Sequence, residues 1–252
     1  MRENVYFVSD VHLRLKESVS ETIKKQRLFG LFDEIMRQNA SLWIVGDLFD
    51  FWFEYKHVIP RQFFSVLRKL QEMTQSGCEI HILGGNHDYW LGSFISNEIG
   101  LKIHPSPIAY SIGGKSFFIT HADGILKRDR WYRVMRWIFR NPVTIALFRM
   151  IHPGLAFGLA AKISQKSRHF SMRDIELETQ ERSELILYGQ ERLKESYDYV
   201  ITGHFHLPTF YLEGEKKIVN LGDWMKYFTF GHFDGQDFRL CYWKCEDSQP
   251  IK

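Results

Sequence analysis

The sequence predicts an α/β fold with a parallel β-sheet at its core. Short apolar runs alternate with amphipathic segments through the first third of the chain, and this order of strand and helix is typical of a parallel sheet. Polar residues follow the apolar runs directly, at the strand ends where ligand sites form in such sheets. The 252 residues fit one large domain, or one domain that carries an insertion.

Three short runs of β-branched and aromatic residues are predicted to be buried strands, at Val5–Ser9, Leu42–Val45 and Glu79–Leu83. Two segments between them repeat apolar residues at helical spacing, at Glu21–Arg37 and Gln62–Gln75. Because these strands and helices alternate, we expect a parallel core whose strands end at one edge.

The second half of the chain is rich in predicted strands, with one large helical interruption. The predicted strands are Ile108–Ile112, Ser116–Thr120, Tyr199–Thr202, Pro208–Leu212, Lys217–Asn220, Tyr227–Phe230 and Phe238–Tyr242. The interruption runs from about residue 122 to residue 195. We interpret residues 125–195 as a helical lid inserted into a single domain that spans residues 1–252.

Basic residues are concentrated in that insertion. Between Lys127 and Arg173 there are eleven Lys or Arg and one acid, a net charge of +10. This leaves −7 for the rest of a chain whose total is +3. Such asymmetry implies that the segment has an anionic partner, whether phosphate, acidic lipid or nucleic acid.

The sequence shows no features of an exported or membrane-spanning protein. No apolar stretch is long enough to cross a membrane, and the N-terminus lacks the basic start and apolar run of an export signal. The three cysteines, Cys78, Cys241 and Cys245, suit a reducing compartment. We therefore expect a cytoplasmic protein without disulfides.

Seven residues in five short motifs could hold metal ions: Asp10, His12, Asp47, Asn86, His121, His204 and His206. Two divalent cations about 3.5–4 Å apart need a bridging anion, and the Asp47 carboxylate has two oxygens for that role. The two members of the Asp-x-His pair, and those of the His-x-His pair, are two residues apart. In an extended segment they would point to the same side, so both members of a pair would reach one metal. The amide oxygen of Asn86 is a neutral ligand, which limits the negative charge beside a phosphate.

In their order along the chain, these motifs resemble those of the calcineurin-like metallophosphoesterases. The resemblance implies two facing mixed β-sheets flanked by helices, and a centre for two divalent metal ions. One ion would take Asp10, His12, Asp47 and His206, and the other would take Asp47, Asn86, His121 and His204. Because the ligands alone do not select the metal, Mn²⁺ is an expectation that the sequence does not test.

Longer segments look like the UDP-2,3-diacylglucosamine pyrophosphatases of lipid A synthesis. They are Ile44–Trp52, Gly85–Gly92 and Gly203–Pro208, with parts of the predicted lid. The resemblance implies hydrolysis of the pyrophosphate bond of UDP-2,3-diacylglucosamine to lipid X and UMP. It implies catalytic roles for Asp47, Asn86 and His87, and substrate contacts by Asn86, His87, Asp129, Tyr132, Ser167, Arg173 and His204.

One residue departs from that pattern. Many members of that enzyme family have Arg after the motif Asn, whereas this chain has His87. A histidine can protonate a leaving group or stabilise charge, whereas an arginine can only stabilise charge. The exact substrate is therefore open, and the alternative is a phosphodiesterase or phosphatase for a different lipid-linked or nucleotide phosphate.

The predicted lid favours a lipid substrate. A basic and apolar helical segment can clamp acyl chains, hold a pyrophosphate and rest on an anionic membrane surface. We expect a monomer attached peripherally to the cytoplasmic face of the inner membrane. Two rivals stay open: a nuclease, against which the apolar content of Val143–Ile163 argues, and a non-enzymatic scaffold, although such relatives usually lose ligands that this chain keeps.

Overall fold

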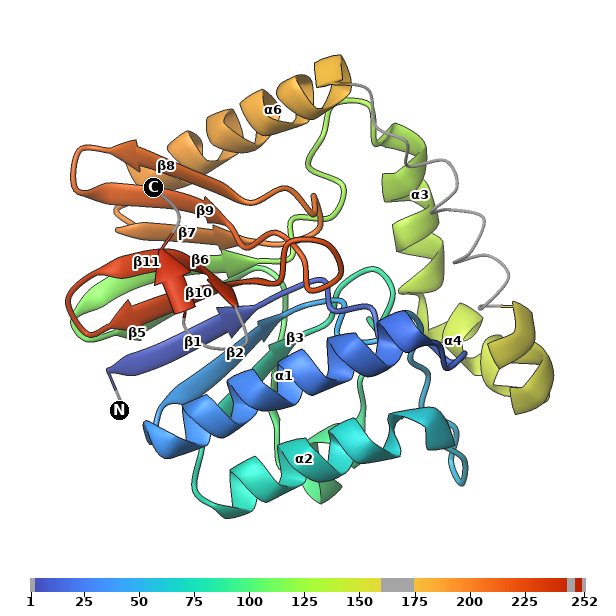
Figure 1. Ribbon diagram of the computed structural model, residues 1–252. Coiled ribbons are helices and arrows are strands. Elements are labelled where there is room, and N and C mark those ends of the chain that lie inside the picture. The colour runs from blue at the N-terminus through green and yellow to red at the C-terminus, as the bar shows by residue number, and fades with distance from the viewer. Residues whose placement is uncertain (1–2, 160–174, 244–247, 251–252) are drawn as a thin grey trace.

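The protein is a sandwich of two β-sheets with helices on both outer faces (Figure 1). The computed structural model describes residues 3–159, 175–243 and 248–250. One sheet has seven strands and the other has five, and both mix parallel and antiparallel pairs. The predicted α/β class and the sandwich implied by the resemblance are confirmed.

The first sheet has the order β12-β11-β10-β1-β2-β3-β4. Its strands are β1 (Asn4–Val8), β2 (Ser41–Val45), β3 (Ile80–Leu83), β4 (Lys102–His104), β10 (Thr229–Asp234), β11 (Phe238–Trp243) and β12 (Ser248–Pro250). Strands β1 to β4 pair in parallel. Side chains alternate along β1, so that Val5 and Phe7 pack between the sheets whereas Tyr6 and Val8 pack under the helices.

Two helices cover the outer face of this sheet. They are α1 (Val19–Arg37) and α2 (Phe64–Gln75), the second preceded by a 3₁₀ turn at Arg61–Phe63. Leu28, Leu31, Phe32 and Ile35 form the buried stripe of α1, as the helical spacing predicted. Ser18 begins α1 by accepting a hydrogen bond from the Glu21 N–H. A short π-helical turn at Phe94–Glu98 precedes β4.

The second sheet has the order β5-β6-β7-β9-β8. Its strands are β5 (Ile108–Ile112), β6 (Lys115–Thr120), β7 (Tyr199–Thr202), β8 (Thr209–Glu213) and β9 (Lys216–Asn220). Helix α6 (Ile175–Lys194) covers its outer face, where Leu193 packs with Val200 and Ile218. The last helix of the inserted stretch thus packs on the sandwich along its length (Figure 1), and only its first turns reach the strand ends, where Glu178 and Glu181 lie.

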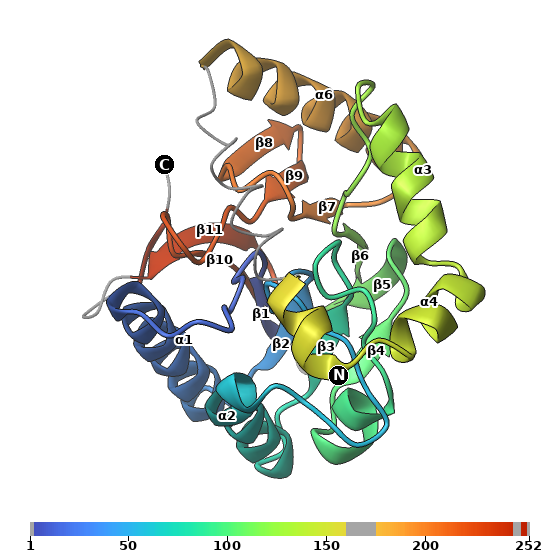
Figure 2. The ribbon, with the colours of Figure 1, turned by 90° about the vertical axis from the view of Figure 1, so that its right-hand side faces the viewer.

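The remaining helices of the insertion stand over the carboxyl ends of the strands, at the right of Figure 1. They are α3 (Arg130–Phe139), α4 (Pro142–Arg149) and a short helix at 153–159. The Asn141 side chain caps α4, with Pro142 at its first position. Figure 2, viewed from the lid side, shows the helix at 153–159 in front of the first sheet, with α3 and α4 at the right.

Three strands differ from the sequence expectation. Strands β4 and β12 were not predicted, because each has three residues and too little apolar pattern. Strand β10 begins at Thr229, two residues after the expected start. The Asp223 carboxylate accepts hydrogen bonds from three backbone N–H groups at residues 225–227, which holds that segment in a turn.

No single helix in the described part of the chain is long and apolar enough to cross a membrane. Two consecutive lid helices, Pro142–Arg149 and Pro153–Leu159, are together long and apolar enough, but the chain bends by 116° between them.

Candidate metal centre

The seven predicted ligands converge where the strands end. Five of them have left-handed backbone conformations: Asp10 (φ 53°), His12 (φ 46°), Asp47 (φ 54°), His204 (φ 72°) and His206 (φ 56°). The extended-chain geometry that we assumed for the Asp-x-His and His-x-His pairs is therefore wrong. Sharp loops aim these side chains inward, and such strained conformations are concentrated at functional sites.

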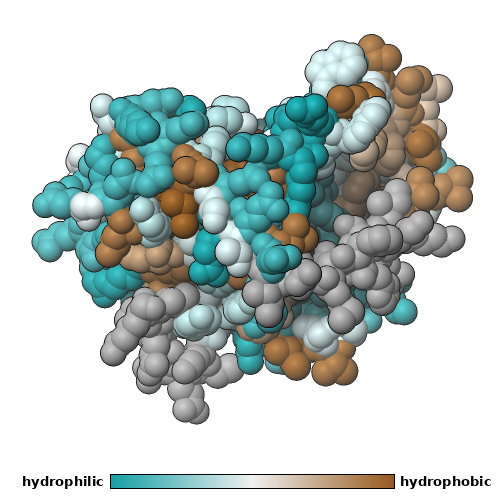
Figure 3. Space-filling model, turned by 90° about the horizontal axis from the view of Figure 1, so that it is seen from above, coloured by the Kyte–Doolittle hydropathy of each residue, from teal (hydrophilic) through white to brown (hydrophobic). Residues whose placement is uncertain are grey.

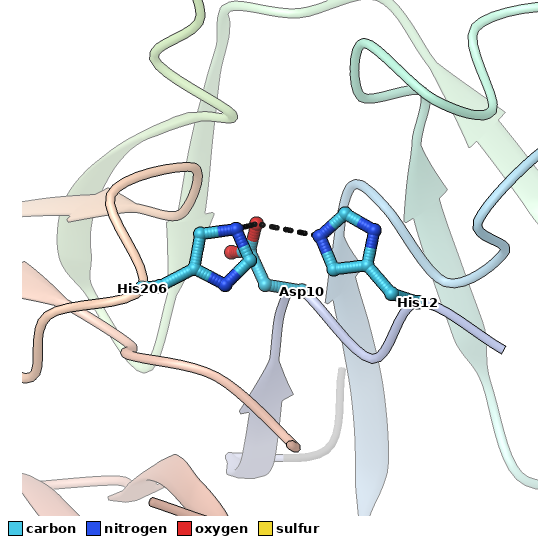
Figure 4. Close-up of side chains that lie close together, drawn as sticks. All are labelled: Asp10, His12 and His206. Atoms are coloured by element: carbon cyan, nitrogen blue, oxygen red, sulfur yellow. Dashed lines mark ion pairs between the residues drawn. The ribbon is translucent and has the colours of Figure 1, made fainter. Parts of the chain in front are cut away.

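Asp10, His12 and His206 form a first cluster with Asp47. The His206 Nε2 lies 3.5 Å from the Asp10 Oδ1, and the His12 Nε2 lies 3.7 Å from the same oxygen. Figure 4 shows both imidazole rings turned toward the Asp10 carboxylate. The His12 Nε2 also lies 3.6 Å from the Asp47 Oδ2. Asp47 thus borders this cluster with one oxygen.

The same Asp47 oxygen borders a second cluster. The His121 Nε2 lies 3.3 Å from the Asp47 Oδ2 and 3.1 Å from the Asn86 Oδ1. The His204 Nδ1 lies 2.9 Å from that Asn86 oxygen. The structure therefore brings all seven residues together in two adjoining groups that share Asp47, the grouping that the resemblance implied. His204 and His206 fall in different groups, so the expectation that both would reach one metal is wrong.

The donor atoms fit divalent cations. Among the described residues, the buried atoms Asp10 Oδ1, His12 Nδ1 and Nε2, and His206 Nδ1 have no hydrogen-bond partner. Burial opposes a charged His12, but Asp10 and Asp50 outweigh it and raise the pKa of His12 to about 9. These buried carboxylates would attract a cation in place of that proton. Mixed carboxylate, imidazole and amide ligands suit a divalent transition metal.

Hydrogen bonds to neighbouring groups orient the ligands. The His121 Nδ1 contacts the Val45 carbonyl at 2.9 Å, which directs Nε2 toward Asp47. The buried Asp88 carboxylate accepts the N–H groups of Gly85 (2.8 Å), Asp47 (3.1 Å) and Phe49 (3.2 Å). Asp88 thereby ties the β2 loop to the β3 loop, the second being the loop that carries Asn86.

Two further supports were not found from the sequence. The buried Lys24 Nζ donates to the His12 carbonyl at 2.6 Å and pairs with Glu21 at 2.7 Å. On the other side, the Asp223 Oδ2 lies 3.7 Å from the His206 Nδ1. Charged residues in a helix usually indicate a solvated face, so the pattern gave no signal that Glu21 and Lys24 point inward.

His87 stands at the rim of the centre. Its backbone N–H donates to the Asp47 Oδ1 at 2.9 Å, and its Nδ1 contacts the Asp50 carbonyl at 2.9 Å. Burial lowers the pKa of His87, although Asp47 opposes the shift. When the Nδ1–H donates to that carbonyl, the Nε2 atom carries the lone pair of the neutral ring.

An apolar cavity of about 350 Å³ adjoins His87 under the lid helices. Its apolar walls come from the lid and from the loops after β2 and β3: Phe51, Trp90, Met135, Phe139, Phe148 and Leu159. The predicted contact Tyr132 lines this cavity and donates its hydroxyl to the Asp123 carboxylate at 2.9 Å. That carboxylate also meets Arg136 (3.3 Å) and Arg140 (3.2 Å), so it anchors α3 beside the metal centre.

The other predicted substrate contacts are distributed differently. Asp129, at the start of α3, lines a second cavity of about 530 Å³ together with His204. Asn86 and His87 line both cavities. Ser167 and Arg173 lie outside the described residues.

Comparisons with known proteins give a family match and several similar relatives. A family model described as calcineurin-like phosphoesterase matches residues 4–208. The UDP-2,3-diacylglucosamine hydrolase of Porphyromonas gingivalis is 34% identical over 93% of this chain and 95% of that protein. Proteins of the same name from Hahella chejuensis and Pseudomonas aeruginosa are 26% and 29% identical, over 96% and 88% of this chain and 98% and 91% of their own lengths.

Among solved structures, vacuolar protein sorting 29 of Cryptosporidium parvum matches with a TM-score of 0.46 and 13% identity. That match covers 99% of this chain and 95% of the other.

Proposed function

This chain belongs to the calcineurin-like phosphoesterase family and is a hydrolase, and from that premise we propose that it hydrolyses the pyrophosphate bond of UDP-2,3-diacylglucosamine. Water adds across the P–O–P bond, and the products are UMP and lipid X, the 2,3-diacylglucosamine 1-phosphate. The proposal places the enzyme in lipid A synthesis, as its relatives' shared name suggests.

The apolar cavity beside the metal centre carries this proposal. A substrate with acyl chains and a pyrophosphate needs an apolar volume next to a phosphate-hydrolysing centre. The cavity meets that need because His87 and Asn86 line it at one end and Phe139, Phe148 and Leu159 line it elsewhere. Acyl chains bury far more apolar surface against these walls than a nucleotide or a small phosphodiester can.

Two Mn²⁺ ions are the proposed cofactors. Asp10, His12 and His206 would hold one and Asn86, His121 and His204 the other, with Asp47 between them. Bound divalent cations lower the pKa of water and neutralise the charge on phosphate oxygens. The buried atoms of Asp10, His12 and His206 without hydrogen-bond partners support a cation in the first of these two places.

The protein's own groups then position the reaction. The Asp47 carboxylate is held in place because its Oδ1 accepts the His87 N–H at 2.9 Å. The His87 Nε2 can take up a proton as the substrate binds and donate it to the departing oxygen. Phe51 and Trp90 form an apolar wall beside this imidazole, which limits the access of water.

The lid is the proposed membrane contact, on the cytoplasmic face of the inner membrane. Its helices expose large apolar side chains beside arginines, among them Trp131 (81% exposed), Trp137 (70%), Val143 (67%) and Met150 (82%). Figure 3 shows hydrophobic side chains gathered at the right, where the lid helices lie, while most of the rest of the visible surface is hydrophilic. An apolar face flanked by basic residues suits an anionic lipid surface.

The lid assignment predicts binding to vesicles that contain anionic lipid. The Trp131→Ser/Trp137→Ser variant should float with such vesicles less than the unaltered protein, and equal flotation would remove the lid from the contact. We expect a monomer that binds no nucleic acid, and sedimentation with and without DNA or RNA tests both points.

The central experiment compares two substrates. The protein should hydrolyse UDP-2,3-diacylglucosamine far more efficiently than bis-p-nitrophenyl phosphate with Mn²⁺, less efficiently with Mg²⁺, and not at all with EDTA. The Asp47→Ala variant should stay folded and lose turnover of both. Turnover of the small diester without turnover of the lipid would contradict the proposed substrate.

A further inference from the structure

A second, polar cavity adjoins the same centre and extends between different elements. Its volume is about 530 Å³, within the range of small-molecule sites. Among the residues that the structure describes, only Asp50, Asn86 and His87 line both cavities. The polar cavity otherwise reaches to the segment after His121, to one face of α6 and to the turn at residues 225–227.

The chemistry of the proposed reaction requires two separate volumes. In an in-line displacement at phosphorus, the attacking and leaving oxygens lie on opposite sides of the transferred group. The two halves of a cleaved pyrophosphate must therefore leave in different directions. The apolar cavity suits the acylated half. The nucleoside half therefore needs a polar volume that also borders His87.

The turn at residues 225–227 gives the polar cavity a wall with a ring and a cation. Lys226 is exposed, and its Nζ lies 3.0 Å from the Tyr227 hydroxyl and 4.7 Å from the centre of the Tyr227 ring. Aromatic faces stack on nucleobases, and ammonium groups bind phosphate oxygens. The Asp223 Oδ1 fixes this turn by accepting three backbone N–H groups.

The same Asp223 connects the turn to the metal centre. Its other oxygen lies 3.7 Å from the His206 Nδ1. Asp223 is 3% exposed. It therefore holds the Tyr227 ring and the Lys226 ammonium at a fixed distance from the metal ligand His206.

Acidic groups form another part of the wall. Asp129 and the half-buried Glu178 line the cavity, and the buried Glu181 pairs with Arg128. Carboxylates repel additional phosphate groups but accept hydrogen bonds from ribose hydroxyls and from the N–H of a pyrimidine base. The wall therefore favours the neutral base and sugar of a nucleoside monophosphate, with its single phosphate directed at the metal centre.

We infer that the polar cavity is the subsite for the uridine monophosphate half of the substrate, with Tyr227 stacking on the base and Lys226 binding its phosphate. This inference rests on the proposed function. It adds specificity-determining residues that lie on the β9–β10 turn, outside the metal-binding motifs.

Direct binding of UMP tests the subsite without requiring turnover. UMP is titrated calorimetrically into the full-length, Mn²⁺-loaded protein and into the variants Tyr227→Leu and Lys226→Met. Loss of base stacking should raise the Kd for UMP by about tenfold or more, and loss of the ammonium by a similar factor. Lys216→Met, a lysine outside the cavity, should bind UMP like the unaltered protein.

A reciprocal variant separates the two cavities. Met135→Ala, in the apolar wall, should raise the KM for the diacylated substrate and leave the Kd for UMP unchanged. Undiminished UMP binding by both Tyr227→Leu and Lys226→Met would overturn the inference. If UMP binding depends on these residues but the diacylated substrate is not cleaved, the proposed substrate is wrong and the nucleotide subsite still stands.

Discussion

Replacing Lys24 by methionine should uncouple the metal ligand His12 from helix α1. The ammonium donates to the His12 carbonyl at 2.6 Å and pairs with Glu21 at 2.7 Å. Lys24 is 3% exposed and Glu21 is 2% exposed, so solvent cannot replace either contact. The His12 backbone has a left-handed φ of 46°, a conformation that surrounding contacts must hold.

The expected loss follows from the burial of this pair. Breaking a buried pair by removing one partner costs roughly 3–5 kcal/mol, because the other charge stays buried. Glu21 would keep the Arg14 N–H at 3.1 Å and the Arg14 guanidinium at 3.6 Å, which favours the lower end of that range. Groups that orient metal ligands typically change metal affinity by about 10–100-fold.

Two measurements separate stability from positioning. Urea unfolding gives the free energy of unfolding, and calorimetric titration with Mn²⁺ gives the metal affinity. The double variant Glu21→Gln/Lys24→Met should recover much of the stability, because no uncompensated charge remains. It should not recover the Mn²⁺ affinity, because the hydrogen bond to the His12 carbonyl is still missing.

The neighbouring Lys25 provides a matched control. Its Nζ pairs at 2.6 Å with Glu17, whose side chain is 57% exposed. Because water can solvate Glu17 once the pair is broken, Lys25→Met should cost only about 0–1 kcal/mol and should leave the Mn²⁺ affinity unchanged. If Lys24→Met binds Mn²⁺ as tightly as the unaltered protein does, Lys24 does not position His12.

Three further predictions concern groups around and beyond the centre. In Gly203→Ala, the added Cβ would overlap the Ser9 hydroxyl and lie 2.8 Å from the Asp10 Oδ2, so Mn²⁺ affinity in calorimetry should fall at least about tenfold and stability by about 1–3 kcal/mol. Asp123→Asn removes the charged acceptor that anchors α3; unfolding should cost about 1.5–3 kcal/mol less, and the KM for the acylated substrate should rise. Burial lowers the pKa of His81 to about 4 in the folded protein. Between pH 6.5 and pH 4, the His81 imidazole is therefore protonated in the unfolded chain and neutral in the folded one. Stability should therefore fall as the pH drops from about 6.5 to 4, by up to ~1.4 kcal/mol per pH unit, and His81→Gln should flatten that slope in urea unfolding.

Each of these predictions has a control or a contrary result. Gly158→Ala, on an exposed helix with no atom within 4 Å of the added Cβ, should not weaken metal binding. An unchanged KM in Asp123→Asn would mean that the lid does not depend on this anchor. His81 faces His104 at 2.7 Å, Glu79 at 3.3 Å and the ring of Tyr110, with Lys102 paired to that Glu79. An equally steep slope after His81→Gln would assign the acid sensitivity to other groups.

The sequence alone determined the sheet core and the ligand set. The continuous apolar run of β1 and the helical stripe of α1 are local properties, because a strand buried on both faces and a helix buried along one stripe dictate which positions are apolar. The ligands could be found because they directly follow apolar strands, and the parallel arrangement brings those strand ends to one edge.

Only the tertiary structure decided how these parts meet. The extended geometry assumed for Asp10 and His12 was wrong because both have left-handed backbones, held by contacts across the sheet edge such as the Asp10 N–H to the Gly46 carbonyl. The sequence pattern did not indicate that Lys24 holds the His12 carbonyl or that Asp223 connects His206 with the turn at residues 225–227. A charged side chain has the same helical periodicity whether it faces water or a buried carbonyl, and only the packing of elements distant in sequence distinguishes the two.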